Sequence, residues 1–250
     1  MGAEKVVIVT GGTYGIGRAI LLILAGRGYR VVAFGQEEKQ IGSAAQKGIE
    51  GTRKELTQRK LDADLLVADV SKAREVEQVI NFAVQKYHRI DALVNNAAIR
   101  PRGTILETSE ELWDQVMAVN LKGMFLATRA ALPQMISQGG GVIVNIGSGS
   151  GWGRAGRLAY CASKGGVFAF SAALARDHRR DNIRVNVVVP GLTPTGMTEG
   201  DNDPLAGNRS NERKLLPEDT ANAVAFLLSE EAAMISGSVI TVGTAPDRSN

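Results

Sequence analysis

Cysteine, histidine and aromatic residues are scarce in this 250-residue chain, and no apolar run reaches the ~18 residues that a membrane span requires. The single cysteine, Cys161, excludes an intrachain disulfide and a cysteine-based metal site, so we expect no bound metal. The 29 basic and 26 acidic side chains nearly balance, which does not favour nucleic acid as a partner. The first residues carry no apolar signal segment. These absences favour a soluble, cytoplasmic protein that binds neither nucleic acid nor a membrane.

Seven short runs rich in β-branched residues alternate with amphipathic, helix-like stretches. The runs lie at residues 6–10, 30–34, 64–67, 92–95, 141–146, 184–189 and 238–242. This alternation predicts an α/β fold, a doubly wound Rossmann-type domain around a mainly parallel seven-stranded sheet. No internal repeat or linker divides the chain. A capping box at Thr108 and Glu111 predicts a helix over 112–131, and the polar residues 196–213 predict a substrate loop.

A glycine-rich turn follows the first predicted strand. Gly11, Gly15 and Gly17 stand between the run 6–10 and an apolar helical stretch at 19–25. Missing side chains let the backbone approach a phosphate, and the N–H groups and dipole of the following helix favour its negative charge. The spacing is G-x-x-x-G-x-G, which differs from the commonest dinucleotide fingerprint.

Tyr160 and Lys164 stand four positions apart, so they share one face of a predicted helix. A free tyrosine has a pKa of about 10 and is a poor base near neutral pH. An ammonium group within roughly 4–6 Å favours the phenolate, so we expect Lys164 to lower the pKa of Tyr160. Ser148 follows a buried strand at the sheet edge where ligands bind, and its hydroxyl suits a substrate carbonyl or alcohol.

These residues resemble the short-chain dehydrogenase/reductase family over nearly the whole chain. The matching motifs are Thr10–Gly17, Asp69-Val70, Asn95–Ala98, Asn120, Ser148, Tyr160 with Lys164, and Asn186 through Gly191 with Thr195. Each motif is modest alone, but their number and order are typical of this family. The resemblance implies that residues 1–250 form one dinucleotide-binding and catalytic domain. It also implies an NAD(P)(H)-dependent oxidoreductase that interconverts a secondary alcohol and a ketone by hydride transfer.

The resemblance assigns a role to each catalytic residue. Tyr160 is the general acid/base on the substrate oxygen, and Lys164 holds the nicotinamide ribose and lowers the tyrosine pKa. Ser148 orients the substrate oxygen, and Asn120 holds a water that links Lys164 to solvent. The implied cofactor-binding residues are Gly11, Thr13, Tyr14, Gly15, Ile16, Gly17, Gly35, Gln36, Asp69, Val70, Asn96, Ala97, Ala98, Tyr160, Lys164, Pro190, Gly191, Thr193 and Thr195.

The sequence departs from the family pattern in several places. Ser148 lies twelve positions before Tyr160, one fewer than usual, which leaves Ser150 as a rival for the catalytic serine. Ala98 stands where the family has a glycine. The loop after Thr195 looks shorter than in typical relatives, which indicates a more open pocket.

Cofactor choice depends on the end of the second predicted strand, Phe34-Gly35-Gln36. An acid there would bind the 2′-hydroxyl of NAD(H), and an arginine would accept the 2′-phosphate of NADP(H), but neither is present. Glu37 and Glu38 follow and would repel a phosphate. We therefore expect a modest preference for NAD(H) over NADP(H).

Four arginines lie in loops expected to rim the site, at positions 100, 102, 154 and 157. Solvated loop charge is the simpler interpretation, but such a group also suits a carboxylate or phosphate on a small alcohol or carbonyl substrate. The resemblance implies a homotetramer, and the apolar excess of helices 111–131 and 165–177 points the same way. The alternative function is a catalytically inactive dinucleotide-binding regulatory protein, which the intact catalytic set disfavours.

Overall fold

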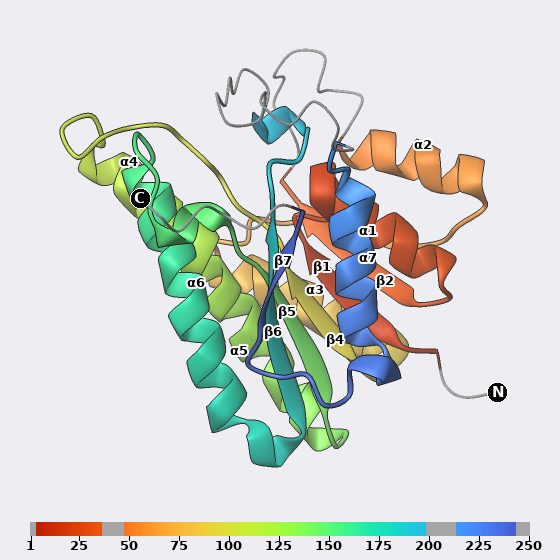
Figure 1. Cartoon of the computed structure of the whole chain (residues 1–250). Helices are drawn as coiled ribbons and strands as arrows, with labels where there is room; N and C mark the ends of the chain where they lie inside the picture. Colours follow the sequence, from red (N-terminus) through yellow and green to blue (C-terminus); the bar gives the residue numbers. More distant parts are fainter. Residues whose placement is uncertain (1–3, 37–47, 199–213, 244–250) are drawn as a thin grey trace.

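One sheet of seven parallel strands forms the centre of the molecule (Figure 1). The computed structural model describes residues 4–36, 48–198 and 214–243. The strands are β1 (Val6–Thr10), β2 (Arg30–Gly35), β3 (Asp64–Val67), β4 (Ala92–Asn95), β5 (Gly141–Ile146), β6 (Ile183–Pro190) and β7 (Val239–Val242). Their order is β3-β2-β1-β4-β5-β6-β7, and every neighbouring pair is parallel. The predicted α/β fold is confirmed.

Helices cover both faces of this sheet (Figure 1). On one face lie α1 (Gly15–Gly26), α2 (Ile49–Arg59) and α7 (Pro217–Leu228), and on the other lie α3 (Ala73–Tyr87), α5 (Gly123–Ser137) and α6 (Leu158–Asp177). In β1, Val7 and Val9 join the core under α1 and α7, whereas Ile8 joins the core under α3 and α5. Because both faces are buried, consecutive strand residues must be apolar, which explains the continuous runs in the sequence.

The strand order reverses at β1, which lies between β2 and β4. Thr10 at the end of β1 is in register with Asn95 at the end of β4. At such a point the loops of an open α/β sheet diverge and leave a crevice beyond the carboxyl ends of the strands. The glycine-rich turn after β1 therefore opens into this crevice.

The helix predicted over 112–131 is interrupted, and its predicted cap is wrong by one residue. Ser109, not Thr108, caps α4 (Glu110–Met117), because its side chain accepts a hydrogen bond from the Leu112 amide at 3.2 Å. The Thr108 hydroxyl instead donates to the Thr104 carbonyl. The π-helical turn η2 (Ala118–Lys122) then joins α4 to α5. This turn contains Asn120, so it positions one of the predicted catalytic residues.

Short 3₁₀ turns complete the loops. They are η3 (Gly149–Trp152), η4 (Arg179–Asp181), η5 (Gly196–Thr198) and η6 (Glu230–Ala232). Only η5 of the predicted substrate loop 196–213 is described; residues 199–213 lie outside the described residues. Figure 1 places η5 at the same end of the sheet as the loops after β1 and β5.

By length and composition alone, α6 is the one helix of the described chain that could cross a membrane. The core helix of a globular protein passes the same test. Val167 of α6 is fully buried against Val187 and Val189 of β6. The helix is thus part of the domain core, and its first turns carry the Tyr160 and Lys164 pair.

Candidate functional site

The turn after β1 is a cradle in which backbone lies against backbone. A Cβ added at Gly17 would lie 2.1 Å from the Gly11 carbonyl oxygen, and one added at Gly11 would lie 2.9 Å from the Ala97 Cα. Gly11 and Gly15 also have φ angles of +61° and +50°, in the left-handed region that favours glycine. No side chain with a Cβ fits these contacts without displacing the turn.

The cradle ends at the N-terminus of α1, which has no acidic residue in its first turn. Its N-cap residue, Tyr14, makes no side-chain capping hydrogen bond. Backbone N–H groups at such a terminus form an anion site. The residues present therefore fit the pyrophosphate of a dinucleotide, as the glycine spacing predicts.

Asn96 closes one wall of the cradle. Its Nδ2 donates to the carbonyls of Thr10 and Gly11 at 3.1 and 3.0 Å. The Thr10 hydroxyl accepts hydrogen bonds from the backbone amides of Asn96 and Ala97, both at 3.0 Å. These bonds tie the end of β4 to the glycine turn, so the predicted residues Asn96 and Ala97 lie beside the predicted pyrophosphate site.

The segment after β6 forms the opposite wall. A Cβ on Gly15 would lie 3.3 Å from the Thr195 side chain, and Gly196 packs directly against the Tyr14 hydroxyl. Upstream, the Gly191 amide donates to the Val242 carbonyl at 2.8 Å, which anchors the segment to β7. We call residues 191–198 the strap. The structure thus brings Thr195, one of the predicted residues of the strap, to the cradle.

Thr13, Gly35 and Gln36 gather where the adenosine half of a dinucleotide would lie. A Cβ added at Gly35 would lie 2.7 Å from the Thr13 hydroxyl, so a side chain there would require Thr13 to move. The Gln36 side chain hydrogen-bonds to the Asp69 carboxylate. Although burial alone would raise it, the pKa of Asp69 is lowered by its hydrogen bonds with Ser71 and Gln36.

Sequence reasoning did not identify one support of this region. Thr52 of α2 is fully buried, and its hydroxyl donates to the Thr13 carbonyl at 3.0 Å. The bond fixes α2 against the cofactor turn. No motif marks Thr52, because the contact joins segments 39 positions apart.

Tyr160 lies in the first turn of α6 and is 6 % exposed. Its hydroxyl hydrogen-bonds to the side chain of Ser148, which lies two residues after the end of β5. The Ser148 Oγ also accepts a hydrogen bond from the Ser150 amide at 3.2 Å. The structure therefore brings Ser148, rather than its rival Ser150, to the tyrosine.

Lys164 is fully enclosed one turn further along α6. Its Nζ donates to the Ile146 carbonyl at 2.7 Å and lies 5.9 Å from the centre of the Tyr160 ring. Burial lowers the pKa of Lys164 from 10.5 to about 8. The lysine thus lies beside the Tyr160 ring and donates its hydrogen bond to the last residue of β5.

The expected effect of Lys164 on its neighbour does not occur in this structure. The pKa of Tyr160 is raised, because burial disfavours the phenolate more than its surroundings favour it. The hydrogen bond from Ser148 and the charges of Arg100 and Arg157 act in the opposite direction. The effect of burial on the Tyr160 pKa is therefore larger than the opposing effects. The two cations that lower this pKa, Arg100 and Arg157, come from the rim of the site.

Asn120 joins the loop after β4 to α6. Its Oδ1 accepts from the Ile99 amide at 2.8 Å, and its Nδ2 donates to the Ile99 carbonyl at 2.9 Å and to the Ser163 hydroxyl at 3.0 Å. The Ser163 hydroxyl in turn donates to the Tyr160 carbonyl. Asn120 is thus a structural tie here. The water-holding role that the resemblance implies stays a prediction.

Two glycines allow α6 to approach the end of β5. A Cβ on Gly151 would lie 2.9 Å from the Lys164 backbone, and one on Gly147 would lie 3.2 Å from the Phe168 ring of α6. Next to them Trp152 stacks on Phe168 with ring centres 4.7 Å apart, yet the tryptophan remains 41 % exposed. It therefore both packs on α6 and presents an aromatic surface beside Ser148.

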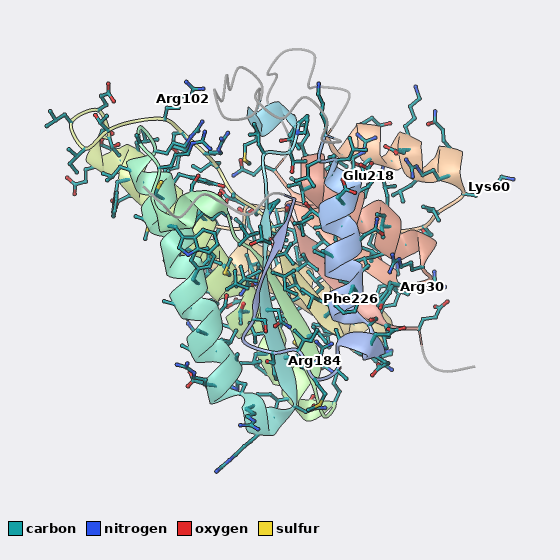
Figure 2. All side chains as sticks on the ribbon, viewed as in Figure 1. Arg30, Lys60, Arg102, Arg184, Glu218 and Phe226 are labelled. Atoms are coloured by element: carbon teal, nitrogen blue, oxygen red, sulfur yellow. The ribbon has the colours of Figure 1, made fainter. Side chains whose placement is uncertain are left out.

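The four rim arginines do not form one uniform group. Arg157 is buried, Arg100 is half-buried, and Arg102 and Arg154 are exposed. Figure 2 shows Arg102 at the end of the molecule that carries η5, far from Arg184 at the lower end of the sheet. A backbone bridge between Gly103 and Arg157 fastens the arginine-bearing loop after β4 to the start of α6.

Replacing Lys164 by methionine measures the cost of burying this ammonium group. With a folded pKa of about 8 against 10.5, the charged form is disfavoured by about 3 kcal/mol. Between these values the unfolded chain binds the extra proton, so the cost is fully present below pH 8 and is relieved as the pH rises to 10.5. We expect Lys164→Met to raise the free energy of unfolding near pH 7, and the gain to shrink over that interval.

Urea unfolding at several pH values checks this expectation. Lys54→Met is the control, because Lys54 is exposed on α2. The control should change stability little at any pH. A gain for Lys164→Met that stays constant from pH 7 to pH 10.5 would show that burial of the charge is not its source.

Comparison with known proteins matches this site to one family. The family model described as short chain dehydrogenase matches residues 5–206. The 3-oxoacyl-[acyl-carrier-protein] reductase FabG of Thermotoga maritima is 36% identical over 248 residues, covering 95% of this chain and 96% of the relative. The FabG of Staphylococcus aureus strain Mu50 is 35% identical, covering 97% and 98% of the two chains.

A crystal structure shows the same likeness in three dimensions. A Burkholderia xenovorans protein assigned to the short-chain dehydrogenases/reductases superposes with a TM-score of 0.86 at 32% identity, over 96% of this chain and 95% of the other. Both the sequence and the fold are thus shared over nearly the full length. The chain belongs to the short-chain dehydrogenase/reductase family and is an NAD(P)-dependent oxidoreductase.

Proposed function

We propose that this protein interconverts a ketone and a secondary alcohol by hydride transfer, with Tyr160 as general acid/base. The observation that carries the proposal is the hydrogen bond between the Tyr160 hydroxyl and Ser148, at the sheet edge that also holds the glycine cradle. The FabG relatives are named as 3-oxoacyl reductases, which supports a ketone as the substrate group.

A proton must accompany each hydride in this chemistry. The dinucleotide, when bound, supplies a hydride to the carbonyl carbon or accepts it from the alcohol. During reduction the Tyr160 hydroxyl donates its proton to the substrate oxygen, and during oxidation the phenolate takes that proton back. Ser148 donates a hydrogen bond to the same oxygen and so fixes it beside the phenol.

The remaining predicted residues position this pair. Lys164 is set under the Tyr160 ring by its bond to Ile146 and would reach the nicotinamide ribose. Asn120 holds the loop after β4 against α6. The residues that would hold the dinucleotide are those of the cradle, the strap and the Gly35–Gln36 segment.

We expect Gly17→Ala to weaken NADH binding by at least about tenfold, or ~1.4 kcal/mol, because its methyl group would collide with the Gly11 carbonyl. Gly26→Ala is the matched control on the same helix, since a Cβ there meets nothing within 4 Å. NADH fluorescence titration measures both, with urea unfolding as a check of folding. Equal affinities in the two folded variants would reject the cradle as the pyrophosphate site.

We expect Tyr160→Phe to lower kcat by roughly 10²- to 10⁴-fold while leaving cofactor affinity nearly unchanged. The substitution removes only the hydroxyl, whose main task is proton transfer in the transition state. The measurement is steady-state turnover on a panel of ketones and alcohols that includes 3-oxoacyl thioesters. Retention of most of the activity would rule out Tyr160 as the acid/base.

The panel also tests an anionic group on the substrate. Arg100, Arg102, Arg154 and Arg157 on the rim support a substrate with a carboxylate or phosphate. The exposed face of Trp152 supports an apolar segment next to the reacting carbon. Matched acids and their methyl esters in the panel separate these two contributions.

We expect kcat/KM to favour NAD(H) over NADP(H) by roughly tenfold, or about 1.4 kcal/mol. Gly35 has no side chain, and Gln36 brings no positive charge to a 2′-phosphate. Gln36→Arg should reverse the preference, whereas the uncharged Gln36→Met should not. Glu37 and Glu38, which entered the sequence argument, lie outside the described residues. A strong preference of the unaltered protein for NADP(H) would refute this reasoning.

The proposed assembly is a homotetramer in which α6 and the α4–α5 region meet another copy. Ala162, Ala169 and Ala173 are exposed on α6, and Phe125 of α5 is 43 % exposed. Small residues on an apolar helix face let a second helix approach closely, and a two-fold interface would pair the face with itself. Light scattering at micromolar concentration should give a tetramer, and Ala169→Glu should reduce the assembly size. Lys54→Glu on α2 is the control, and an unaltered protein that is monomeric would refute the proposal.

A further inference from the structure

Arg100 occupies a place over the Tyr160 ring that no motif predicts. It lies five positions beyond the end of β4, and its guanidinium carbon is 6.0 Å from the centre of that ring. Its Nη1 also donates to the Met197 carbonyl of the strap at 3.3 Å. Contacts with two separate segments, α6 and the strap, thus contribute to the position of this guanidinium over the phenol.

We propose that Arg100 is a positioning residue that holds a permanent positive charge beside the Tyr160 phenol and thereby stabilises its phenolate form. The inference deepens the proposed alcohol–ketone chemistry, because it concerns the tyrosine that would transfer the proton. The positive charge that stabilises the phenolate then comes from Arg100, at the rim of the site. Arg100 is not one of the predicted catalytic residues.

The need for a second cation follows from the burial of Lys164. The two cations lie at nearly equal distances from the ring centre, 5.9 Å for Lys164 and 6.0 Å for Arg100. Because burial lowers the pKa of Lys164 to about 8, the lysine loses its charge as the pH rises above that value. A guanidinium keeps its charge throughout the range in which proteins are active. Arg100 therefore still acts on the phenol where Lys164 does not.

The titratable groups around the phenol come from three segments. Arg100 comes from the loop after β4, Arg157 from the residue before α6, and Cys161 and Lys164 from α6 itself. Burial raises the pKa of Tyr160, the Ser148 hydrogen bond and the charges of Arg100 and Arg157 lower it, and Cys161 raises it slightly further. Arg100 precedes Arg157 in the size of its effect, so it is the better residue to remove.

A purely structural role for Arg100 makes a different prediction. The strap that Arg100 holds at Met197 also touches the cradle, where Gly196 packs on the Tyr14 hydroxyl. If Arg100 only held the strap, its loss would change cofactor affinity and would leave the titration of Tyr160 unaltered. The decisive experiment must therefore observe the phenol directly.

The first test is a ¹³C NMR titration of protein labelled at tyrosine Cζ, without cofactor or substrate. The chain has four tyrosines, and Tyr160→Phe identifies the signal of Tyr160. We expect Arg100→Met to move the Tyr160 midpoint to higher pH and Arg100→Lys to leave it close to that of the unaltered protein. Arg179→Met is the control and should not move the midpoint, because it removes an exposed arginine of η4, which precedes β6 and so lies at the other end of that strand from the site.

The second test is the pH profile of alcohol oxidation, using an uncharged alcohol accepted in the substrate panel, so that a loss of anion binding by Arg100 does not enter the rate. Below the midpoint, kcat/KM should fall roughly three- to tenfold in Arg100→Met, because less phenolate is present. At high pH the rate should return to its plateau, whereas a structural defect would lower it throughout. Arg100→Lys should restore most of the rate at low pH.

The two tests separate this inference from the proposed function. A shifted midpoint in Arg100→Met without turnover on any alcohol or ketone would support the role of Arg100 and reject the proposed reaction. The same Tyr160 titration in Arg100→Met as in the unaltered protein, or a signal that stays protonated in both, would overturn the inference. An equal shift of the Tyr160 midpoint in the control Arg179→Met would also overturn the inference.

Discussion

The buried hydrogen bond from Lys164 to the Ile146 carbonyl fixes how α6 meets the sheet, and the site depends on that contact. It joins the second turn of α6 to the last residue of β5, so Tyr160 is brought to Ser148. The close approach is possible only because Gly147 and Gly151 lack side chains. The same enclosure removes both titratable groups from water, which raises the pKa of the tyrosine and lowers that of the lysine.

That enclosure explains why the site draws its charge from loops. A nearby cation stabilises a phenolate, but desolvation disfavours the charge of a lysine that is buried with it. Arg100 and Arg157 lie nearer the rim, on segments fastened together through Gly103. An arginine side chain keeps its charge even where the residue is buried, as Arg157 is. The site thus takes its positive charge from residues that do not lose it to desolvation.

Much of the fold could be predicted because its signals are local. Each of these signals lies within a few consecutive residues. They are the β-branched runs, the glycines after β1 and the four-residue spacing of Tyr160 and Lys164. The π-turn at Ala118–Lys122 could not be predicted, because its residues read as ordinary helix formers in an amphipathic pattern. The cap was misplaced because Thr108 and Ser109 both carry a suitable hydroxyl, and only the path of the loop selects Ser109.

The site was harder to predict wherever two distant segments meet. The spacing of Ser148 and Ser150 left both open, and only the packing of η3 on α6 brings Ser148 to the phenol. The four-residue spacing placed Lys164 beside Tyr160. It could not show that burial would raise the pKa of Tyr160 in spite of the neighbouring lysine. Likewise, the contacts of Arg100 with Tyr160 and Met197 span 60 and 97 positions. The charged groups that set the pKa of Tyr160 therefore come from tertiary contacts that the sequence does not reveal. The position of Tyr160 itself can be predicted, because it depends on a local motif, its four-residue spacing from Lys164.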